Sequence, residues 1–365
     1  MRVLVVNTGS SSLKLSVLDD DALLRACTVE KWLGEEHLDP VRDFLASADG
    51  IDAVGHRIVH GGPRLRGAVR LVPEVLAYLE SITDLAPLHL PRALAAVRAV
   101  EALLPGVTAV ACFDTSFHAT LPDEAATYAL PREWNARWGL RRYGFHGLSH
   151  GYAAARAAEL LGRPLSDLRM VTCHLGAGAS LAAIRGGRSV DTTMGFTPLA
   201  GLVMVTRSGS VDPGMLLWLL RHGGIEPGEL GDALEHRSGL AGLSGTSGDL
   251  REVLVARDTG DADAALAFDV FCHRLAREVA GMAASAGGLD ALVLTGGIGE
   301  HSPEVRADLA ERLRFLGVAV HPRRNAAAIG DCDLSTEGAQ VSTVVVAARE
   351  DLEVARQTIA VLGSG

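Results

Sequence analysis

The chain carries one local pattern near its start and repeats it near its middle. Residues 3–19 read VLVVNTGSSSLKLSVLD, and residues 170–187 read MVTCHLGAGASLAAIRGG. In both stretches a run of strand-forming residues leads into a turn of small residues, and an alternating segment follows (Leu13, Leu15 and Val17 in the first). The repeat predicts two half-molecules of similar design, each starting with a β-hairpin. By itself the repeat is also compatible with two unrelated hairpins in a chain rich in alanine and glycine.

The chain has the length and composition of a globular protein with more than one domain. Its 365 residues predict about two or three domains, and 48% hydrophobic with 21% charged residues is typical of a packed protein. No apolar run reaches membrane-spanning length, and the short run after Arg2 is too brief for a secretory signal. We therefore expect a cytoplasmic location and no membrane partner.

The charge balance bears on the partners. Lys and Arg number 34 against 44 Asp and Glu, a net charge of −10. A surface of that sign repels the nucleic-acid backbone, so we expect no nucleic-acid partner. A phosphorylated or carboxylated ligand would need cations concentrated locally, which makes single arginines informative.

The five cysteines are scattered and never form a CxxC pair, so the sequence predicts neither a disulfide framework nor a thiolate zinc site. They read as small apolar core residues. They are Cys27, Cys112, Cys173, Cys272 and Cys332.

Strand-like and helical runs alternate along the chain. RVLVV, VTAVACF, RMVTCHL and ALVLTGG have the pattern of strands, and PRALAAVRAVEALL, HGYAAARAAELLG and ALAFDVFCHRLAREVAGMAASAG that of helices. This alternation predicts an α/β fold.

The turns of the repeated hairpins suit an anion. Small residues let backbone N–H groups approach phosphate oxygens. Ser10, Ser11 and Ser12 add hydroxyl donors, Lys14 adds a positive charge, and Asn7 adds an amide oxygen able to face a metal or its water. A serine-rich hairpin with a chance lysine is the alternative. No GxxxxGK[ST] loop is present, so a P-loop is excluded.

A third glycine-rich stretch, ALVLTGGIGEHSPEVR at 291–306, runs from an apolar strand through Gly296, Gly297 and Gly299 towards a helix. Three glycines within four positions favour close approach of a flat base or ribose over a plain strand-to-helix connection.

A family resemblance rests on motifs that follow one another in a fixed order. They are NTGSSSLK, GHRIVHGG, DLAPLH, CFDTSFHATLP, RRYGFHGLSH, CHLGAGAS, VDTTMGFTPLAGL, TRSGSVDPG, SGDLRE and TGGIGEHS. By these motifs the chain resembles the acetate kinases from residue 3 to about 356. The resemblance implies two actin-like (ribonuclease H-like) domains related by internal duplication, with the active site in the cleft between them. It implies an N-terminal domain of residues 1–118 plus 352–365, and a C-terminal domain of 119–351 with most nucleotide contacts. A homodimer is also implied.

The implied reaction is the reversible, Mg²⁺ (or Mn²⁺) dependent transfer of the γ-phosphoryl group of ATP to acetate, giving acetyl phosphate and ADP by direct in-line transfer. A carboxyl group with a pKa near 4.3 is already ionised at pH 7, so it needs no base. The barrier is repulsion between two anions, and cations placed along the line of attack lower it.

The resemblance assigns catalytic roles to four residues. Arg57 would hold the substrate carboxylate, and Arg207 and His146 would stabilise the transferring phosphoryl group. Asp114 matches an aspartate treated in the family as an acid or base. Because the substrate is already ionised, we expect Asp114 instead to orient Arg57 or a metal-bound water, with a pKa lowered by nearby cations.

The metal ligands implied by the resemblance are Asn7 and Glu350, whose oxygens suit Mg²⁺. His146 and His150 stand four apart and offer a zinc alternative, but the glutamate of HExxH and a nearby third ligand are absent from the sequence.

The remaining implied contacts line the two ligands. The acyl group would meet Arg57, Val59, Leu88, Phe145 and Pro198. One methylene is worth about 0.8 kcal/mol of burial, so this largely apolar pocket favours acetate with propionate close behind. The nucleotide would meet Ser10, Ser12, Lys14, His174, Leu175, Gly176, Ala177, Gly178, Asp249, Leu250, Arg251, Gly297, Ile298, Gly299, Glu300 and His301.

Several positions depart from the family pattern. Ala177, His301 and Arg349 stand where asparagine is usual, and Ala200 stands where glutamate is usual. Without the side-chain amide of an asparagine at position 177, one hydrogen bond to phosphate is lost, which is worth about 0.5 to 1.5 kcal/mol of binding free energy. The catalytic set itself is complete, so we expect a working enzyme.

Two other functions stay open. A sugar or other small-molecule kinase on the same fold would need a base for a hydroxyl and a polar pocket, and the paired arginines and apolar pocket argue against it. A non-catalytic nucleotide-driven clamp would tolerate loss of the arginines.

Overall fold

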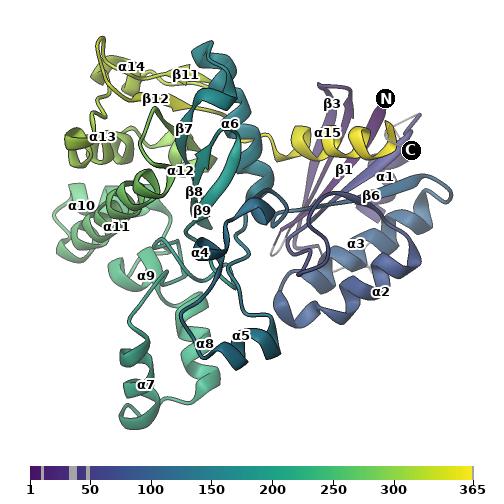
Figure 1. Ribbon diagram of the computed structural model, residues 1–365, viewed down its shortest axis with the longest axis horizontal. Helices are drawn as coiled ribbons and strands as arrows, with labels where there is room; N and C mark the ends of the chain where they lie inside the picture. Colours follow the sequence, from purple (N-terminus) through teal and green to yellow (C-terminus); the bar gives the residue numbers. More distant parts are fainter. Residues whose placement is uncertain (10–11, 33–38, 47–49, 364–365) are drawn as a thin grey trace. The chain divides into compact units, whose positions relative to one another are not determined.

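The computed structural model divides into two compact units, each with its own six-stranded sheet (Figure 1). It describes residues 1–9, 12–32, 39–46 and 50–363. Unit 1 comprises Met1–Ala119, Phe145–Tyr152 and Arg349–Gly365, and unit 2 comprises Thr120–Gly144 and Ala153–Ala348.

The described residues of unit 1 form six strands, and helices cover the sheet. Its elements are β1 (Arg2–Thr8), β2 (Ser12–Asp19), β3 (Ala22–Glu30), α1 (Asp39–Ala46), β4 (Ala53–Ile58), β5 (Val69–Arg70), α2 (Pro73–Ser81), η1 (Thr83–Leu85), α3 (Leu90–Leu103), β6 (Thr108–Phe113) and α15 (Glu350–Gly363). Two further elements, η2 (Phe117–Thr120) and α6 (Gly147–Leu161), begin in unit 1 and end in unit 2.

Unit 2 contains the second sheet and most of the helices. Its elements are α4 (Asp123–Ala126), α5 (Arg132–Trp138), η3 (Leu165–Asp167), β7 (Arg169–Leu175), β8 (Ala179–Arg185), β9 (Arg188–Thr192), α7 (Pro213–His222), α8 (Pro227–His236), α9 (Gly239–Ser244), α10 (Leu250–Asp258), α11 (Ala262–Ala286), β10 (Ala291–Thr295), α12 (Gly296–His301), α13 (Pro303–Arg312), η4 (Arg314–Leu316), α14 (Pro322–Ala326), β11 (Cys332–Asp333) and β12 (Ser342–Val345).

The two sheets share one topology, which confirms the predicted duplication. The order in unit 1 is β3-β2-β1-β4-β6-β5, and unit 2 contains the matching series β9-β8-β7-β10-β12 with β11 at its edge. In each unit the first three strands of this series pair antiparallel, while the third, fourth and fifth pair in parallel. The echoed stretches of sequence are the β1–β2 and β7–β8 hairpins.

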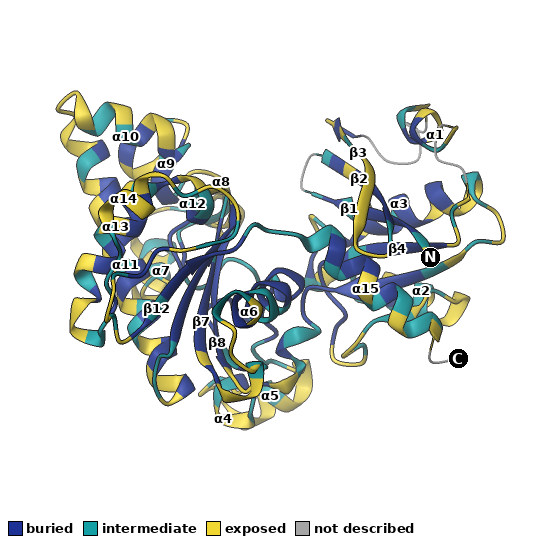
Figure 2. Ribbon diagram, turned by 90° about the horizontal axis from the view of Figure 1, so that it is seen from above, coloured by how far each residue is buried: buried dark blue, intermediate teal, exposed yellow. Residues whose placement is uncertain are grey.

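Alternating side chains on β1 fill the core on both faces of the sheet in unit 1. Leu4 and Val6 belong to the cluster that includes Ala96 and Val100 of α3. The opposite face packs against α15, and the central strands of both sheets are largely buried, whereas the edge strand β3 is mostly exposed (Figure 2). At Gly55 on β4 a Cβ atom would lie 2.5 Å from Thr358 Oγ1, so only glycine lets α15 approach this closely.

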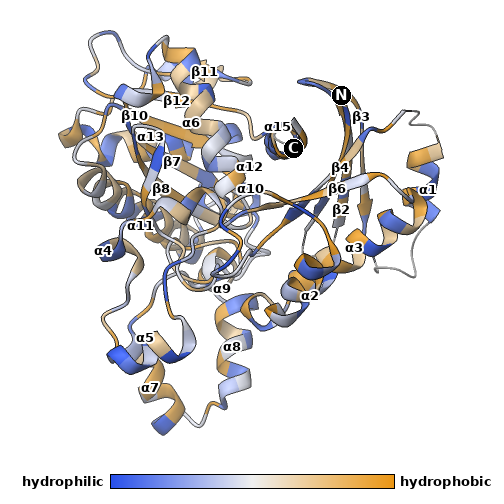
Figure 3. Ribbon diagram, turned by 45° about the vertical axis from the view of Figure 1, so that its right-hand side comes forward, coloured by the Kyte–Doolittle hydropathy of each residue, from blue (hydrophilic) through white to orange (hydrophobic). Residues whose placement is uncertain are grey.

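The caps of α11 show how the sequence sets the ends of a long helix. Asp261 accepts a hydrogen bond from the Ala264 N–H at its start, and Gly287 ends it in the left-handed region with φ of +77°. The helix is apolar along its buried face, and it packs on β7 and β8 (Figure 3).

The glycine-rich stretch at 291–306 differs from its prediction in detail. The sharp turn falls at Gly296, whose φ is +77°, and the remaining glycines lie inside the short helix α12. A second helix, α13, begins at Pro303 after the Ser302 cap. The strand therefore turns directly into a helix, because one left-handed residue is enough to reverse the chain.

The units differ from the predicted domain ranges at two segments. Phe145–Tyr152 lies within the range predicted for the C-terminal domain, and it packs with unit 1, as do residues 349–351. This difference matters for function because both segments carry residues expected in the catalytic site.

Burial keeps three of the buried histidines of unit 1 uncharged. Burial lowers the pKa of His56 to about 3 and those of His60 and His118 to about 4. The unfolded chain would protonate the same side chains near pH 6.5. Between pH 4 and 6.5 the unfolded state therefore binds more protons than the folded state, and acid favours unfolding.

We predict that the free energy of unfolding falls as the pH is lowered from 6.5 towards 4. The slope is about 1.4 kcal/mol per pH unit for each such histidine. Urea unfolding followed by circular dichroism at pH 7.5 and pH 5.0 measures it. The variant His56→Gln should flatten the slope by one histidine, while His222→Gln, at an exposed position, should not. Equal slopes in all three proteins would contradict the prediction.

Candidate active site

Three parallel strands of unit 1 place polar side chains at one edge of the sheet. Asn7 stands near the end of β1, and Arg57, its register partner, stands near the end of β4. Asp114 directly follows β6, and its backbone N–H donates to the Ile58 carbonyl oxygen. Because the carboxyl ends of neighbouring parallel strands share an edge, these residues meet although they lie far apart in sequence.

Arg57 is held from several sides in this cluster. Its Nε and Nη2 donate to the two carboxylate oxygens of Asp114 at 2.9 and 2.6 Å, and its Nη1 donates to Asn7 Oδ1 at 2.9 Å. Glu350 Oε2, at the start of α15, lies 3.8 Å from Arg57 Nε and accepts from Asn7 Nδ2 at 3.1 Å. These bonds use three of the five guanidinium N–H groups.

The cluster is nearly dry. The side chain of Asp114 is 1% exposed, and those of Arg57 and Glu350 are 14% and 17% exposed. Burial alone would lower the pKa of Arg57, but the carboxylates of Asp114 and Glu350 outweigh burial and raise it. Arg57 is therefore a permanent cation next to two carboxyl groups.

The expectation for the acidity of Asp114 is wrong in sign. Burial raises the pKa of the Asp114 carboxyl and Glu350 adds to this, while Arg57 and a backbone hydrogen bond from His146 oppose it. Desolvation was not visible in the sequence, where only the charges could be counted. The expected contact between Asp114 and Arg57 is present, and its two-pronged geometry is that of a carboxylate.

His146 stands in a strained turn next to this cluster. Its φ is +55°, a left-handed conformation that costs a non-glycine residue about 1 to 2 kcal/mol. The next residue, Gly147, donates its N–H to the Asp114 carbonyl oxygen at 2.8 Å. A Cβ atom at 147 would lie 2.2 Å from that oxygen, so glycine is required here.

The phosphate turn of the first hairpin is described only in part. Ser10 and Ser11 lie outside the described residues. Ser12 begins β2 and its carbonyl oxygen accepts from the Gly9 N–H, while Lys14 pairs with Asn7 across the hairpin with an exposed side chain. Lys14 thus stands next to the Arg57 cluster in the sheet register.

The expected acyl-contact residues of unit 1 differ in exposure. Val59 is 7% exposed and Phe145 is 1% exposed, whereas Leu88 is 54% exposed. The ring of Phe145 packs edge-on against His60 at 5.5 Å between centroids. Pro198, the fourth, belongs to unit 2.

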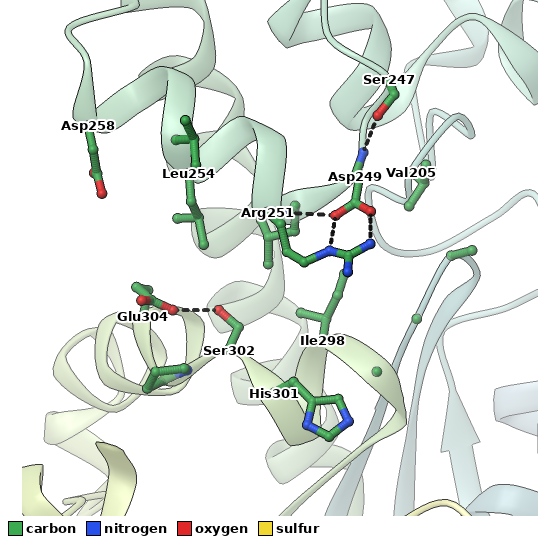
Figure 4. Close-up of a pocket in the computed structure, with 16 residues that line it drawn as sticks. Val205, Ser247, Asp249, Arg251, Leu254, Asp258, Ile298, His301, Ser302 and Glu304 are labelled. Carbon is green, nitrogen blue, oxygen red and sulfur yellow. Dashed lines mark hydrogen bonds and ion pairs between the residues drawn. The ribbon is translucent and has the colours of Figure 1, made fainter. Parts of the chain in front are cut away.

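Unit 2 has a cavity of about 890 Å³ beside the second hairpin turn (Figure 4). Many expected nucleotide contacts line it, from the hairpin turn, the start of α10 and helix α12. They are Gly176, Ala177, Asp249, Leu250, Arg251, Gly297, Ile298 and His301. Sequence reasoning missed further lining residues, among them Val205, Ser247, Leu254 and Ser302.

Asp249 and Arg251 form an ion pair at the rim of this cavity. Asp249 caps α10 by accepting from the Arg251 N–H at 2.9 Å, and it also accepts from the guanidinium of the same residue at 2.9 and 2.5 Å (Figure 4). These bonds with Arg251 lower the pKa of Asp249 to about 2. The aspartate therefore stays ionised through the neutral range.

The other nucleotide residues expected in unit 2 are not among the residues that line the cavity. His174 and Leu175 end β7, and the Gly178 carbonyl oxygen accepts from the Gly176 N–H. Gly299 and Glu300 offer their carbonyl oxygens to the buried guanidinium of Arg306 at 3.0 and 2.7 Å. Arg306, which sequence reasoning also missed, thus fixes α12 from the core side.

Arg207 belongs to unit 2 and is held by the segment expected near the acyl group. Its Nη1 donates to the Pro198 carbonyl oxygen at 2.8 Å, and burial lowers its pKa. A cation kept partly dry interacts more strongly with an anion than one in water does.

The described part of the chain has two features that bear on metals and membranes. No group of three or more His, Cys, Asp or Glu side chains that could hold a metal ion occurs there. None of the helices in the same residues has the length and apolar character needed to span a bilayer.

The repeated strand order places the chain in the actin-like class of two-unit α/β proteins. A family model described as the Acetokinase family matches residues 35–356. An acetate kinase of Synechococcus sp. is 52% identical over 324 residues, which cover 89% of this chain and 78% of that protein. The chain therefore belongs to the acetokinase family.

Solved structures support the same family assignment. The crystal structure of Porphyromonas gingivalis acetate kinase matches with a TM-score of 0.91 and 37% identity, covering 99% of both chains. That of a propionate kinase from Francisella tularensis matches with a TM-score of 0.91 and 33% identity, covering 98% of this chain and 99% of the other.

Proposed function

We propose that this chain catalyses the reversible transfer of the γ-phosphoryl group of ATP to acetate, forming acetyl phosphate and ADP. The observation that carries the proposal is Arg57, a cation fixed by Asp114 and Asn7 in a nearly dry cluster. Among the relatives, the Synechococcus protein and the P. gingivalis structure are named acetate kinases. Membership of their family supports the same reaction here.

Arg57 would receive the carboxylate substrate. Asp114 and Asn7 take three of its N–H groups, and the remaining two can donate to a small anion without any rotation of the side chain. A cation that is already oriented needs no reorganisation when charge develops. Asp114 is then a positioning group and not a base, because the substrate arrives ionised.

Unit 2 would hold the nucleotide in its cavity. The glycines of the hairpin turn and of α12 leave room for phosphate and sugar, and Leu254 with Ile298 offers an apolar surface for a base. Arg207 would add positive charge for the transferring phosphoryl group, as His146 would from unit 1. Ala177 is exposed in this lining, and unlike an asparagine it has no side-chain amide to donate to phosphate.

Asn7 and Glu350 fit a magnesium ion by their chemistry. Glu350 carries carboxylate oxygens and keeps part of its surface exposed, and Asn7 carries an amide oxygen that accepts from Arg57 while its Nδ2 donates to Glu350 at 3.1 Å. Mg²⁺ binds through one or two carboxylates, several waters and substrate phosphates, so this small donor set is sufficient. When bound, the ion would neutralise phosphate charge.

Acetate is the substrate we favour, with propionate as the alternative. Val59 and Phe145 are apolar and buried, and they would discriminate between the two acids only by the burial of one methylene, about 0.8 kcal/mol. The F. tularensis relative is named a propionate kinase at a similar structural likeness.

We predict that purified protein with MgATP and acetate forms an acyl phosphate that hydroxylamine traps as a coloured hydroxamate. Propionate should give a smaller signal and glucose none. Arg57→Ala and Arg207→Ala should each lower the rate at least about 10³-fold, because each removes a cation from the path of two anions.

Arg356→Ala is the matched control, since Arg356 forms an exposed ion pair with Asp21 and should leave the rate unchanged. Circular dichroism checks that all variants fold. Phosphorylation of glucose would favour a sugar kinase. ATP binding without any phosphoryl transfer to a carboxylate would favour a nucleotide-driven clamp.

We also propose that two copies of this chain pair through unit 2, in line with the homodimer implied by the family resemblance. Helix α7 exposes three large apolar side chains, Met215, Leu217 and Trp218, at 44%, 50% and 58% exposure. Side chains of this size are usually buried, and a symmetric pair of helices would cover them.

Sedimentation equilibrium should give twice the chain mass of 38.2 kDa for the wild-type protein. The double variant Leu217→Glu, Trp218→Glu should sediment as a monomer, because it places charges on the apolar face of α7. Val255→Glu, at a 65% exposed position on α10, is the control and should leave the mass unchanged. A wild-type monomer would refute the pairing.

A further inference from the structure

The turn that carries His146 is tied on both sides to the segment that follows β6. On one side the Gly147 N–H donates to the Asp114 carbonyl oxygen at 2.8 Å. On the other side His118 Nε2, on η2, lies 3.0 Å from the carbonyl oxygen of Phe145. The left-handed residue His146 therefore stands between two peptide groups, each of which is bonded to the stretch from Asp114 to His118.

The partner of His118 fixes the state of its ring. A carbonyl oxygen only accepts hydrogen bonds, so Nε2 must carry a hydrogen and donate it to Phe145. The imidazole is 1% exposed and packs edge-on against the rings of Phe117 and His150, at 5.6 and 5.7 Å between centroids. The ring is held in place by packing, and its donor points at one peptide group.

We propose that His118 is a positioning residue for the acyl kinase reaction, which holds the Phe145–His146 peptide so that His146 stays in its left-handed conformation. The proposal rests on the function proposed above. The Nε2–H of His118 is directed at the Phe145 carbonyl oxygen, so we assign it no direct contact with a substrate. His118 acts through the backbone of Phe145, which is expected to contact the acyl group, and of His146, which is expected to contact the phosphoryl group.

Loss of this hydrogen bond has a distinctive consequence. The turn would relax towards an ordinary backbone conformation, which displaces the His146 imidazole and the Phe145 ring together. A misplacement of about 1 Å can lower a rate about 100-fold. The cavity proposed for the nucleotide belongs to unit 2, so the affinity for ATP should stay unchanged.

The test compares two substitutions at one position. His118→Phe keeps an aromatic ring and removes the donor, whereas His118→Gln keeps an N–H donor at similar reach. We expect kcat to fall about 10- to 100-fold in His118→Phe, with KM for ATP unchanged and with an altered ratio of acetate to propionate turnover. His118→Gln should recover at least about a third of the wild-type kcat.

Thr358→Val is the matched control, because Thr358 is fully buried in the same unit and donates to the Val354 carbonyl oxygen. It should lower the melting temperature and leave kcat unchanged. Equal kcat in His118→Phe and the wild-type protein, or equal losses in His118→Phe and His118→Gln, would overturn the proposal.

A measurement on the intact wild-type protein does not depend on whether a variant folds. Long-range ¹H–¹⁵N correlation spectra of histidine-labelled protein should show His118 neutral with its hydrogen on Nε2. A hydrogen on Nδ1 alone would overturn the proposal. Wild-type protein that transfers phosphate to neither acetate nor propionate would instead overturn the proposed function.

Discussion

One buried ion pair organises the candidate site of unit 1. Arg57 and Asp114 come from neighbouring parallel strands, and each would be unfavourable without the other in so dry an environment. Their pairing leaves a guanidinium that is fixed in place and still able to donate. Asn7 and the His146 turn are hydrogen-bonded to this pair or to its backbone, and Glu350 accepts from Asn7 and lies 3.8 Å from Arg57 Nε. The cation, its supports and the strained histidine thus form one connected structure.

The two units use one topology for different purposes. At the carboxyl ends of its parallel strands unit 1 places charged side chains, which close the edge around Arg57. At the equivalent ends unit 2 places small residues, the Gly176 turn and the Gly296 turn, which leave a wide cavity. A site of fixed charges suits a small anion, and a roomy site lined by glycine suits a nucleotide. The two units share the duplicated sheet topology, and the side chains at the strand ends give each unit a different kind of site.

The sequence was most informative where local pattern decides the structure. The two hairpins, α3 and α11 follow from periodicity, and the duplicated topology follows from the repeat. It was least informative where burial decides. The raised pKa of Asp114 depends on desolvation, and the roles of His118 and Arg306 depend on which carbonyl oxygens they reach. Phe145–Tyr152 packs with unit 1 because of tertiary contacts that no local pattern records.

Equilibrium binding of acetate in the absence of nucleotide tests the central role of Arg57 most directly. Titration of ¹³C-labelled acetate followed by NMR should give saturable binding to the wild-type protein. Arg57→Gln should lose that binding while its affinity for ADP stays unchanged, because Arg57 belongs to unit 1 and the cavity proposed for the nucleotide belongs to unit 2. Acetate binding that survives in Arg57→Gln, or a loss of ADP affinity of the same size, would contradict the account.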